Sequence, residues 1–386
     1  MGTARRLGAF VMMAVGLTAC APRPMDPRLH AQVRRDLPES GNGIVRVRFL
    51  GVQGFVIQRN EDRVVTAPLY SNPALDDVLS DKKIEPNKAV VRAFLPREWV
   101  SGATAILVGH SHYDHLMDVP LIAHELAPEA RVVGSVTARD LVASLGASDG
   151  DYFVDPQRVI AVNDAAQDGG DGVDYRSCLR RPREGCIHGS GEGRWFPVGP
   201  RVRIRALCSR HSPQFLRANT AWPGCKAPLS GPPQRASHWA LGDTFAYLID
   251  FLEDGVPLYR VYFQDSPTDR EFGHVPSELL AEKRVDLALL TAGAFDQVDD
   301  FPESIITTLD PRYVLLGHWE DFFRIPSRRM RALWMFDFVD LTDRLDRLRG
   351  PFARPRRWEG EYWFPAPGQL FVFPVGEPVN DTQGPR

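Results

Sequence analysis

Apolar residues recur along the chain with two different periods, which predicts strands alternating with helices. Residues 44–58 alternate around Gly51 and Gly54, which predicts a pair of strands. Helical spacing predicts helices over residues 119–127, 137–146 and 327–349. Further strands are predicted over residues 62–68, 103–110, 130–136, 201–209, 244–250, 258–265, 285–293 and 313–318. This order is typical of an α/β protein.

Length and composition fit a globular enzyme-sized domain. The chain has 386 residues, of which 44% are hydrophobic and 25% charged, with a net charge of −3. No basic surface or glycine-rich phosphate loop is evident, so we expect no nucleic-acid partner. We expect one folded domain over residues 44–376, interrupted by a loop-rich stretch between 163 and 200, and a disordered tail over residues 377–386.

The N-terminus has the pattern of an export signal. Arg5 and Arg6 precede an apolar run over residues 7–15 that is too short to span a bilayer. The following tetrapeptide, Leu-Thr-Ala-Cys, ends at Cys20 and resembles the lipobox of bacterial lipoproteins. That resemblance implies a signal peptide over residues 1–19, a lipidated Cys20 and a flexible tether over residues 20–43. It places the protein in the bacterial cell envelope, anchored to the outer membrane and facing the periplasm.

Three of the ten histidines lie within the segment VGHSHYDHLMD, directly after an apolar strand. His110 and His112 are two residues apart, so both side chains point the same way from an extended segment. Asp114 and His115 follow on the turn that opens the next helix. Imidazole and carboxylate are ligands of zinc and related ions, so the segment predicts a metal site.

The motif HSHYDH resembles the second motif of the metallo-β-lactamase superfamily. That family carries further ligands at later strand ends, and candidates occur in the right order at His211, Asp265 and His318. The resemblance covers about residues 44–376. It implies an αββα sandwich with the metal site at one edge of the two sheets.

The resemblance also implies a binuclear site. One metal would bind His110, His112 and His211, and the second Asp114, His115 and His318, with Asp265 bridging them. Two divalent ions, zinc above all and otherwise iron or manganese, would hold a hydroxide that attacks an ester. Asp114 would also serve as the general base.

The expected substrate is a small-molecule or lipid-like ester with a phosphodiester or lactone-type bond, as in the phospholipase D-like and phosphodiesterase branches. The alternative is a catalytically degenerate envelope lipoprotein that acts as a binding or scaffold protein.

Some assignments stay open at the level of sequence. His238 and Asp243, in the segment SHWALGDTF, are alternative ligands to His211 and Asp265. Tyr113 either polarises the substrate or packs under the loop. Ala67 stands where many family members have an aspartate that supports the metal site. His124, His188 and His274 lack a strand-end position, so we expect them on the surface or in packing.

Arginines and an apolar stripe lie near the motifs, and cysteines occur later in the chain. Arg210, Arg324, Arg328 and Arg329 lie close to predicted ligands, where they either bind a phosphate or belong to the ordinary surface. Residues 327–349 are expected to pack an apolar stripe on the sheet. In an oxidising compartment we expect disulfides, most readily between Cys178 and Cys186, from a set of four residues, Cys178, Cys186, Cys208 and Cys225.

Overall fold

Two seven-stranded β-sheets form the centre of the protein. The computed structural model describes residues 43–145, 152–163, 194–214, 221–225, 229, 231–351 and 357–375. The first sheet has the order β14 (Leu370–Pro374), β1 (Ile44–Gly51), β2 (Gly54–Arg59), β3 (Asp62–Thr66), β4 (Ala105–Leu107), β5 (Arg131–Gly134) and β6 (Val159–Ala161). The second has the order β13 (Glu361–Trp363), β12 (Tyr313–Gly317), β11 (Leu287–Thr291), β10 (Val256–Gln264), β9 (Thr244–Glu253), β8 (Val202–Ser209) and β7 (Phe196–Gly199).

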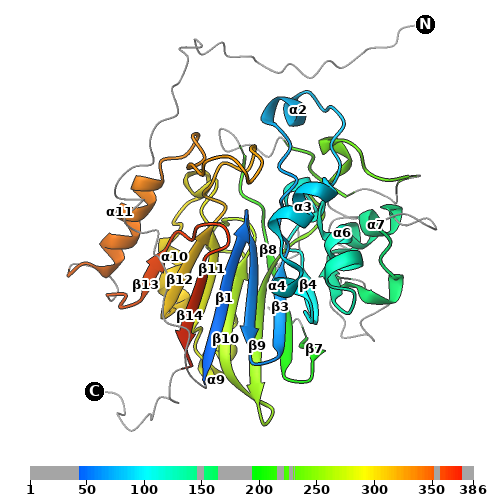
Figure 1. Ribbon diagram of the computed structural model, residues 1–386. Helices are drawn as coiled ribbons and strands as arrows, with labels where there is room; N and C mark the ends of the chain where they lie inside the picture. Colours follow the sequence, from blue (N-terminus) through cyan, green and yellow to red (C-terminus); the bar gives the residue numbers. More distant parts are fainter. Residues whose placement is uncertain are drawn as a thin grey trace, which may run out of the picture.

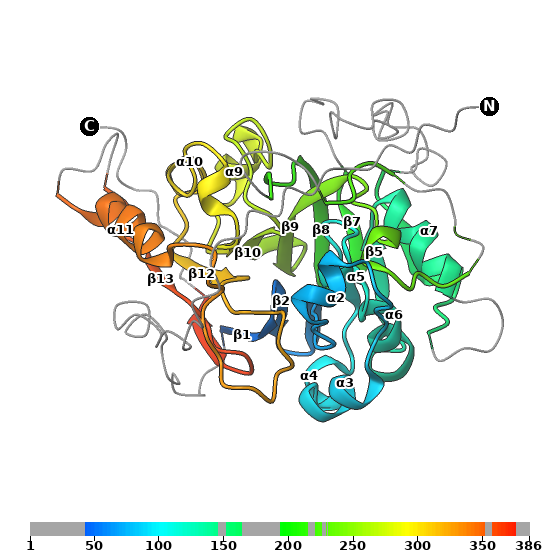
Figure 2. The same cartoon turned by 90° about the horizontal axis from the view of Figure 1, so that it is seen from above.

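Helices cover the outer faces of both sheets (Figures 1 and 2). The first sheet carries α2 (Leu75–Leu79), α3 (Lys88–Phe94), α4 (Arg97–Val100), α5 (Tyr113–Leu116), α6 (Val119–Leu121) and α7 (Val136–Leu145) on its side of the molecule. The second carries α9 (Ser277–Glu282), α10 (Glu303–Leu309) and α11 (Phe338–Arg349). The predicted αββα sandwich is therefore confirmed.

The core between the sheets is built from alternate residues of facing strands. Val45, Val47 and Phe49 of β1 belong to the same buried cluster as Tyr247 and Ile249 of β9. Among the described residues, this cluster contains none from a helix. The strand residues that alternate with its members belong to a second buried cluster, which also contains helix residues. The period of two seen in the sequence thus separates an inner from an outer face of each sheet.

Strand directions place several strand ends at one edge. Strands β10, β11 and β12 are parallel neighbours, and β9 is antiparallel to both β8 and β10. Strands β8, β10 and β12 therefore run the same way and end at the same edge of the second sheet. In the first sheet, β3, β4 and β5 are parallel as well.

The helix predicted over residues 327–349 is only half correct. Helix α11 begins at Phe338, because the side chain of Asp337 caps it by accepting hydrogen bonds from the backbone N–H groups of Val339 and Asp340. Residues 327–337 form a loop instead, and Trp334 is 68% exposed. The apolar stripe on the sheet is therefore confined to residues of α11 and Leu333.

Of the four cysteines from which disulfides are expected, the structure describes two, and one of these two is paired. Cys208 is a free thiol, whereas Cys225 is in a disulfide. Cys178 and Cys186, the pair that the sequence favoured, lie outside the described residues, as do the predicted signal peptide and tether.

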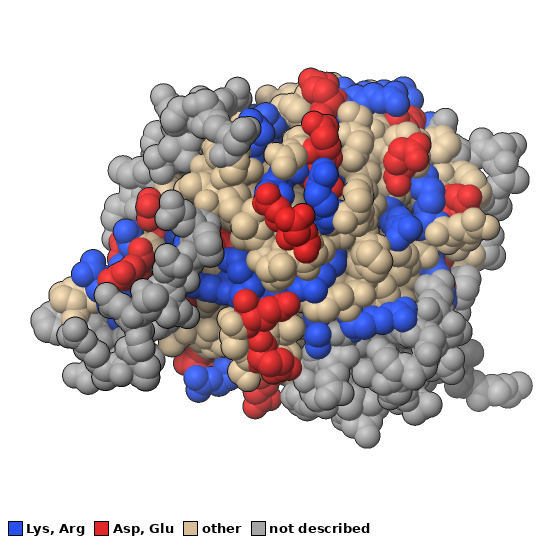
Figure 3. Space-filling view, turned by 90° about the horizontal axis from the view of Figure 1, so that it is seen from below, with Lys and Arg blue, Asp and Glu red and all other residues tan. Residues whose placement is uncertain are grey.

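The surface of the described part shows no single dominant charge at the end of the sheets drawn in Figure 3, where positive and negative side chains lie side by side. Among the helices that the structure describes, none has the length and apolar composition needed to cross a membrane.

Candidate metal centre

Three predicted ligands come from the ends of strands that run the same way. Asp265 directly follows β10 and His318 directly follows β12, whereas His211 lies two residues beyond β8. Strand β10 lies midway between β8 and β12 in the sheet. The topology therefore places Asp265 between the two histidines.

The remaining ligands come from the loop between β4 and α5. This loop holds His110 and His112, and Asp114 and His115 lie in the single turn of α5. A Cβ atom at Gly109 would lie 2.2 Å from the Cβ of Asp265, closer than real contacts allow. Only glycine at this position lets the loop approach Asp265.

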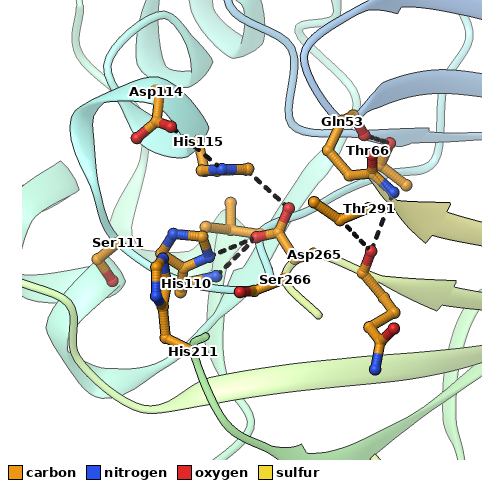
Figure 4. A network of polar contacts seen from close by, with 12 residues as sticks. Gln53, Thr66, His110, Ser111, Asp114, His115, His211, Asp265, Ser266 and Thr291 are labelled. Atoms are coloured by element: carbon orange, nitrogen blue, oxygen red, sulfur yellow. Dashed lines mark hydrogen bonds and ion pairs between the residues drawn. The ribbon is translucent and has the colours of Figure 1, made fainter. Parts of the chain in front are cut away.

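The structure brings all seven predicted ligands together in three overlapping groups. In each group, the possible ligand atoms lie within 4.8 Å of one another. Figure 4 shows Asp265 between His110 and His115, with Asp114 on the far side of His115. The groups are His110 with His112 and His211; His110 with His115 and Asp265; and Asp114 with His115 and His318.

The cluster has two halves, the first formed by His110, His112 and His211 and the second by Asp114, His115 and His318. Asp265 contacts both halves through different oxygens. Its Oδ2 accepts a hydrogen bond from the backbone N–H of His110 at 2.9 Å and lies 3.0 Å from Nδ1 of that residue. Its Oδ1 lies 2.7 Å from Nδ1 of His115. The aspartate is thus shared by the two halves, as expected of a bridging ligand.

Asp114 lies next to His115 and His318, on the side of the second half that is exposed to solvent. Its Oδ2 lies 3.3 Å from Nε2 of His318 and 3.4 Å from Nε2 of His115. The Asp114 side chain is 14% exposed, compared with 1% for Asp265. Of the two carboxylates, Asp114 is therefore the one that a water or a substrate can reach.

Burial keeps one half of the cluster neutral. It lowers the pKa of His112 to about 3, with the neighbouring His110 adding to the effect. Burial also lowers the pKa of His110 and takes that of His211 well below its usual range. Neutral imidazoles keep a lone pair free, which is the form that binds a metal.

The other half is polarised by its carboxylates. Burial opposes the charge on His115, but Asp265 and Asp114 outweigh it and raise the pKa of His115 to about 10. Burial likewise opposes the charges on the two carboxylates, yet the neighbouring His115 holds the pKa of both Asp114 and Asp265 below the usual range. A divalent ion bound in this half would face the same two carboxylates that raise the pKa of His115.

The unpartnered atoms of the cluster fit divalent metal ions. The Nε2 atoms of His110 and His112 are buried and have no hydrogen-bond partner in the structure. Buried polar atoms normally find a partner, and each one that does not needs an explanation. A set of imidazoles and carboxylates with free ring nitrogens suits zinc and related ions.

Asp118 supports the site in a way that the sequence did not reveal. Its carboxylate accepts hydrogen bonds from the backbone N–H groups of Tyr70 and Ser71 at 2.7 and 2.9 Å and from the Ser71 hydroxyl at 2.5 Å. Burial raises its pKa. These bonds fasten the loop that follows Ala67.

A second buried network holds the end of β10. The side-chain amide of Gln53 and the hydroxyl of Thr291 both donate to the carbonyl of Gln264, each at 2.9 Å (Figure 4). Gln264 directly precedes Asp265, so this network fixes the backbone that carries the shared carboxylate.

The alternative ligands are held elsewhere. Nδ1 of His238 accepts a hydrogen bond from the Gln234 N–H at 3.2 Å, and Asp243 accepts one from the Asn163 amide at 2.5 Å. No ligand group found among the described residues contains either of them. His211 and Asp265 occupy the places for which His238 and Asp243 were the alternatives.

The other residues singled out by the sequence lie outside the cluster. Tyr113 is 4% exposed and packs edge-on against Trp222, with ring centroids 6.0 Å apart. Nδ1 of His124 lies 2.8 Å from the carbonyl oxygen of Phe153. No described ligand group includes His274, and His188 lies outside the described residues.

Comparison with known proteins gives distant structural matches only. No protein-family model matches the chain, and no curated protein matches it. Igni18, a metallo hydrolase from the archaeon Ignicoccus hospitalis, is 15% identical with a TM-score of 0.41, and the match covers 86% of this chain and 98% of that one.

Two bacterial structures match in the same way. The metallo-beta-lactamase fold protein YhfI from Bacillus subtilis is 12% identical with a TM-score of 0.43, over 86% of this chain and 100% of that one. A possible metal-dependent hydrolase from Veillonella parvula is 13% identical with a TM-score of 0.43, over 86% and 99%. Likenesses this distant say nothing of the reaction, so the chemistry must be inferred from the side chains of the centre.

Proposed function

We propose that the protein is a metal-dependent hydrolase of the metallo-β-lactamase superfamily that binds two divalent ions, with zinc the expected metal. The observation that carries the proposal is the convergence of seven histidine and aspartate side chains in three overlapping ligand groups. His110, His112 and His211 would hold one ion. Asp114, His115 and His318 would hold the other, with Asp265 between them.

Each part of the cluster has a separate task in this proposal. Bound divalent ions would acidify a water and stabilise the charge that develops on the reacting oxygens. Asp265 fixes the distance between the two halves, because each of its oxygens faces a different histidine. Asp114 accepts the proton of the attacking water, because it is the more exposed carboxylate.

The bond that we propose is an ester, of the phosphodiester or lactone type. This choice rests on the resemblance of Tyr113 in the segment HYDHL to the phospholipase D-like and phosphodiesterase branches. The alternative is a scaffold protein that has kept the fold but lost the activity. A scaffold has no need for unpartnered ring nitrogens in a buried cluster, so we favour the enzyme.

A substitution at Asp114 tests the hydrolase. Asp114→Asn keeps the shape and one oxygen but loses the charge, so we expect hydrolysis to fall by about 10²–10⁴-fold, the usual contribution of a general base. The zinc-loaded protein would be screened against bis(p-nitrophenyl) phosphate, an aryl lactone and a chromogenic β-lactam. Asp76→Asn, on the exposed surface of α2, is the matched control and should keep full activity.

The same screen separates the enzyme from the scaffold. Wild-type protein that contains its metals but cleaves none of the three probes would favour the scaffold. Cleavage that survives Asp114→Asn unchanged would remove Asp114 from the reaction without removing the enzyme.

We further propose that the protein acts at the bacterial cell envelope, on the periplasmic side of the outer membrane. The support is the lipobox-like sequence that ends at Cys20. Anchoring by lipid would keep the metal centre within reach of membrane-associated esters.

A further inference from the structure

The chain directly after His318 forms a pocket beside the metal centre. One wall comes from the end of β1 and the segment that follows β3, with Leu50, Leu69 and Asn72 among its residues. The other wall is residues 320–331, which we term the arginine loop. Figure 2 shows the segment between β12 and α11, which contains this loop, beside β1 and β2.

Hydrogen bonds fix the arginine loop to the metal centre and to the opposite wall. Val52 accepts a hydrogen bond from the backbone N–H of His318 and donates its own N–H to Oε1 of Glu320. The side-chain amide of Asn72 donates to the carbonyl of Arg324 at 2.7 Å. The ring of Phe322 packs edge-on against the ring of His318 at 4.6 Å. The pocket is therefore positioned by the same chain that carries a predicted ligand.

The arginines of this loop are of two kinds. Arg331 is paired, with its Nε donating to Oδ2 of Asp321 at 2.6 Å. Arg324, Arg328 and Arg329 also line the pocket, but their guanidinium groups form no ion pair or hydrogen bond with any residue that the structure describes. Three unneutralised positive charges thus surround one opening.

The pocket is also lined by the carboxyl group of Glu320, which has one hydrogen-bonded oxygen. Glu320 is 7% exposed, and its Oε1 is taken by the Val52 N–H. Its Oε2 is buried and has no hydrogen-bond partner among the described residues. This buried carboxyl group holds the start of the arginine loop against Val52, so the unpaired arginines farther along the loop remain available to a ligand.

We propose that this pocket binds the phosphate group of a phosphate-ester substrate, with Arg324, Arg328 and Arg329 pairing to the phosphate. A guanidinium group binds two phosphate oxygens through parallel hydrogen bonds, and three such groups more than balance the one or two negative charges of a phosphate ester. The inference rests on the proposed function, because it assigns the pocket to the substrate of that centre.

A lipid headgroup or a soluble metabolite can supply the same phosphate ester. Ile325 lines the pocket and is 40% exposed, and Trp334 and Met335, a few residues beyond the arginine loop, are 68% and 40% exposed. Arginine next to exposed tryptophan and aliphatic residues is also the pattern of surfaces that meet lipid. The experiment therefore includes both kinds of ligand.

Calorimetric titration of the chelator-treated full chain measures binding to the pocket without the metals. The probes are sn-glycerol 3-phosphate and dihexanoyl phosphatidic acid below its micelle concentration, with succinate as a dianion of another geometry. The test variant is Arg324→Gln/Arg328→Gln/Arg329→Gln. The matched control is Arg97→Gln/Arg270→Gln/Arg347→Gln, which removes the same charge from exposed positions outside the pocket.

We expect at least one phosphate ester to bind the metal-free protein, the test variant to weaken that binding at least about tenfold, and the control to leave it unchanged. Tighter binding of the phosphatidic acid would identify a lipid source, and tighter binding of glycerol phosphate a soluble one. No binding to the metal-free protein, equal binding by the test variant, or succinate binding as tightly as the phosphates would overturn the proposal. Metal content is measured separately, so loss of the pocket and loss of the hydrolase centre are distinguishable.

Discussion

Oδ1 of Asp265 lies 2.7 Å from Nδ1 of His115, while the other oxygen of the same carboxylate faces His110. This contact joins the two halves of the candidate centre. It arises because β10 lies midway between β8 and β12, so the residue that follows β10 is placed between the residues that follow the other two strands.

The first prediction concerns this shared carboxylate. Asp265→Asn keeps the size of the side chain but removes the charge that faces both histidines, so we expect metal content to fall from about two to one or fewer per chain. Plasma mass spectrometry of the purified variant measures it. Asp243→Asn is the control and should keep both metals, because Asp243 is engaged by Asn163 instead. Two metals in Asp265→Asn would contradict the shared role.

The second prediction separates the two candidates for the third histidine ligand. We expect His211→Ala to lose one metal, because His211 shares a ligand group with His110 and His112. His238→Ala should keep both metals, because Nδ1 of His238 accepts a local backbone hydrogen bond instead. Metal content of the two variants, measured side by side, decides the matter. The opposite outcome would require the centre to be rebuilt around the segment SHWALGDTF.

The third prediction concerns stability. Asp118→Ala leaves the donors of Tyr70 and Ser71 without their acceptor in a buried place, so we expect the free energy of unfolding to fall by about 2 kcal/mol or more. Denaturant unfolding followed by circular dichroism measures the loss. Asp77→Ala, on an exposed face of α2, should change it by less than about 0.5 kcal/mol. An unchanged Asp118→Ala would show that the loop after Ala67 is held by other contacts.

The fourth prediction concerns anchoring. Cys20→Ser should leave the protein soluble in the periplasm or with an uncleaved signal peptide, because serine cannot take the lipid. The centre should keep its metals in either form. Cys208→Ser, which removes a free thiol of the folded part, should remain with the membrane fraction. A Cys20→Ser protein that still fractionates with lipid after removal of its signal would refute the anchoring.

The sequence was most informative where polar ligands directly follow apolar strands. The strands that precede His110, His211, Asp265 and His318 are all present, and the four side chains meet. A buried strand is marked by its apolar run, and an ionisable residue just after it has few structural reasons to be there. The local pattern predicted a metal site at the motif HSHYDH, and the resemblance of that motif to the metallo-β-lactamase superfamily implied the αββα sandwich and the later ligands.

The sequence was least informative where contacts between distant segments decide the structure. Asp118 looked like one more polar residue after the motif, and only the fold brings it to Tyr70 and Ser71. The apolar stripe over residues 327–349 suggested one helix, but the Asp337 cap starts α11 at Phe338. The pocket beside His318 is formed by loops more than two hundred residues apart, and local patterns carry no signal for such a pairing.

Metal content of the purified wild-type protein tests the central claim most directly. After purification in zinc-containing buffer and removal of loosely bound ions by gel filtration, plasma mass spectrometry should find about two zinc ions per chain. Dialysis against a strong chelator should remove them, together with any hydrolysis found in the probe screen. Fewer than one equivalent of any transition metal in the folded, zinc-replete protein would contradict the binuclear hydrolase.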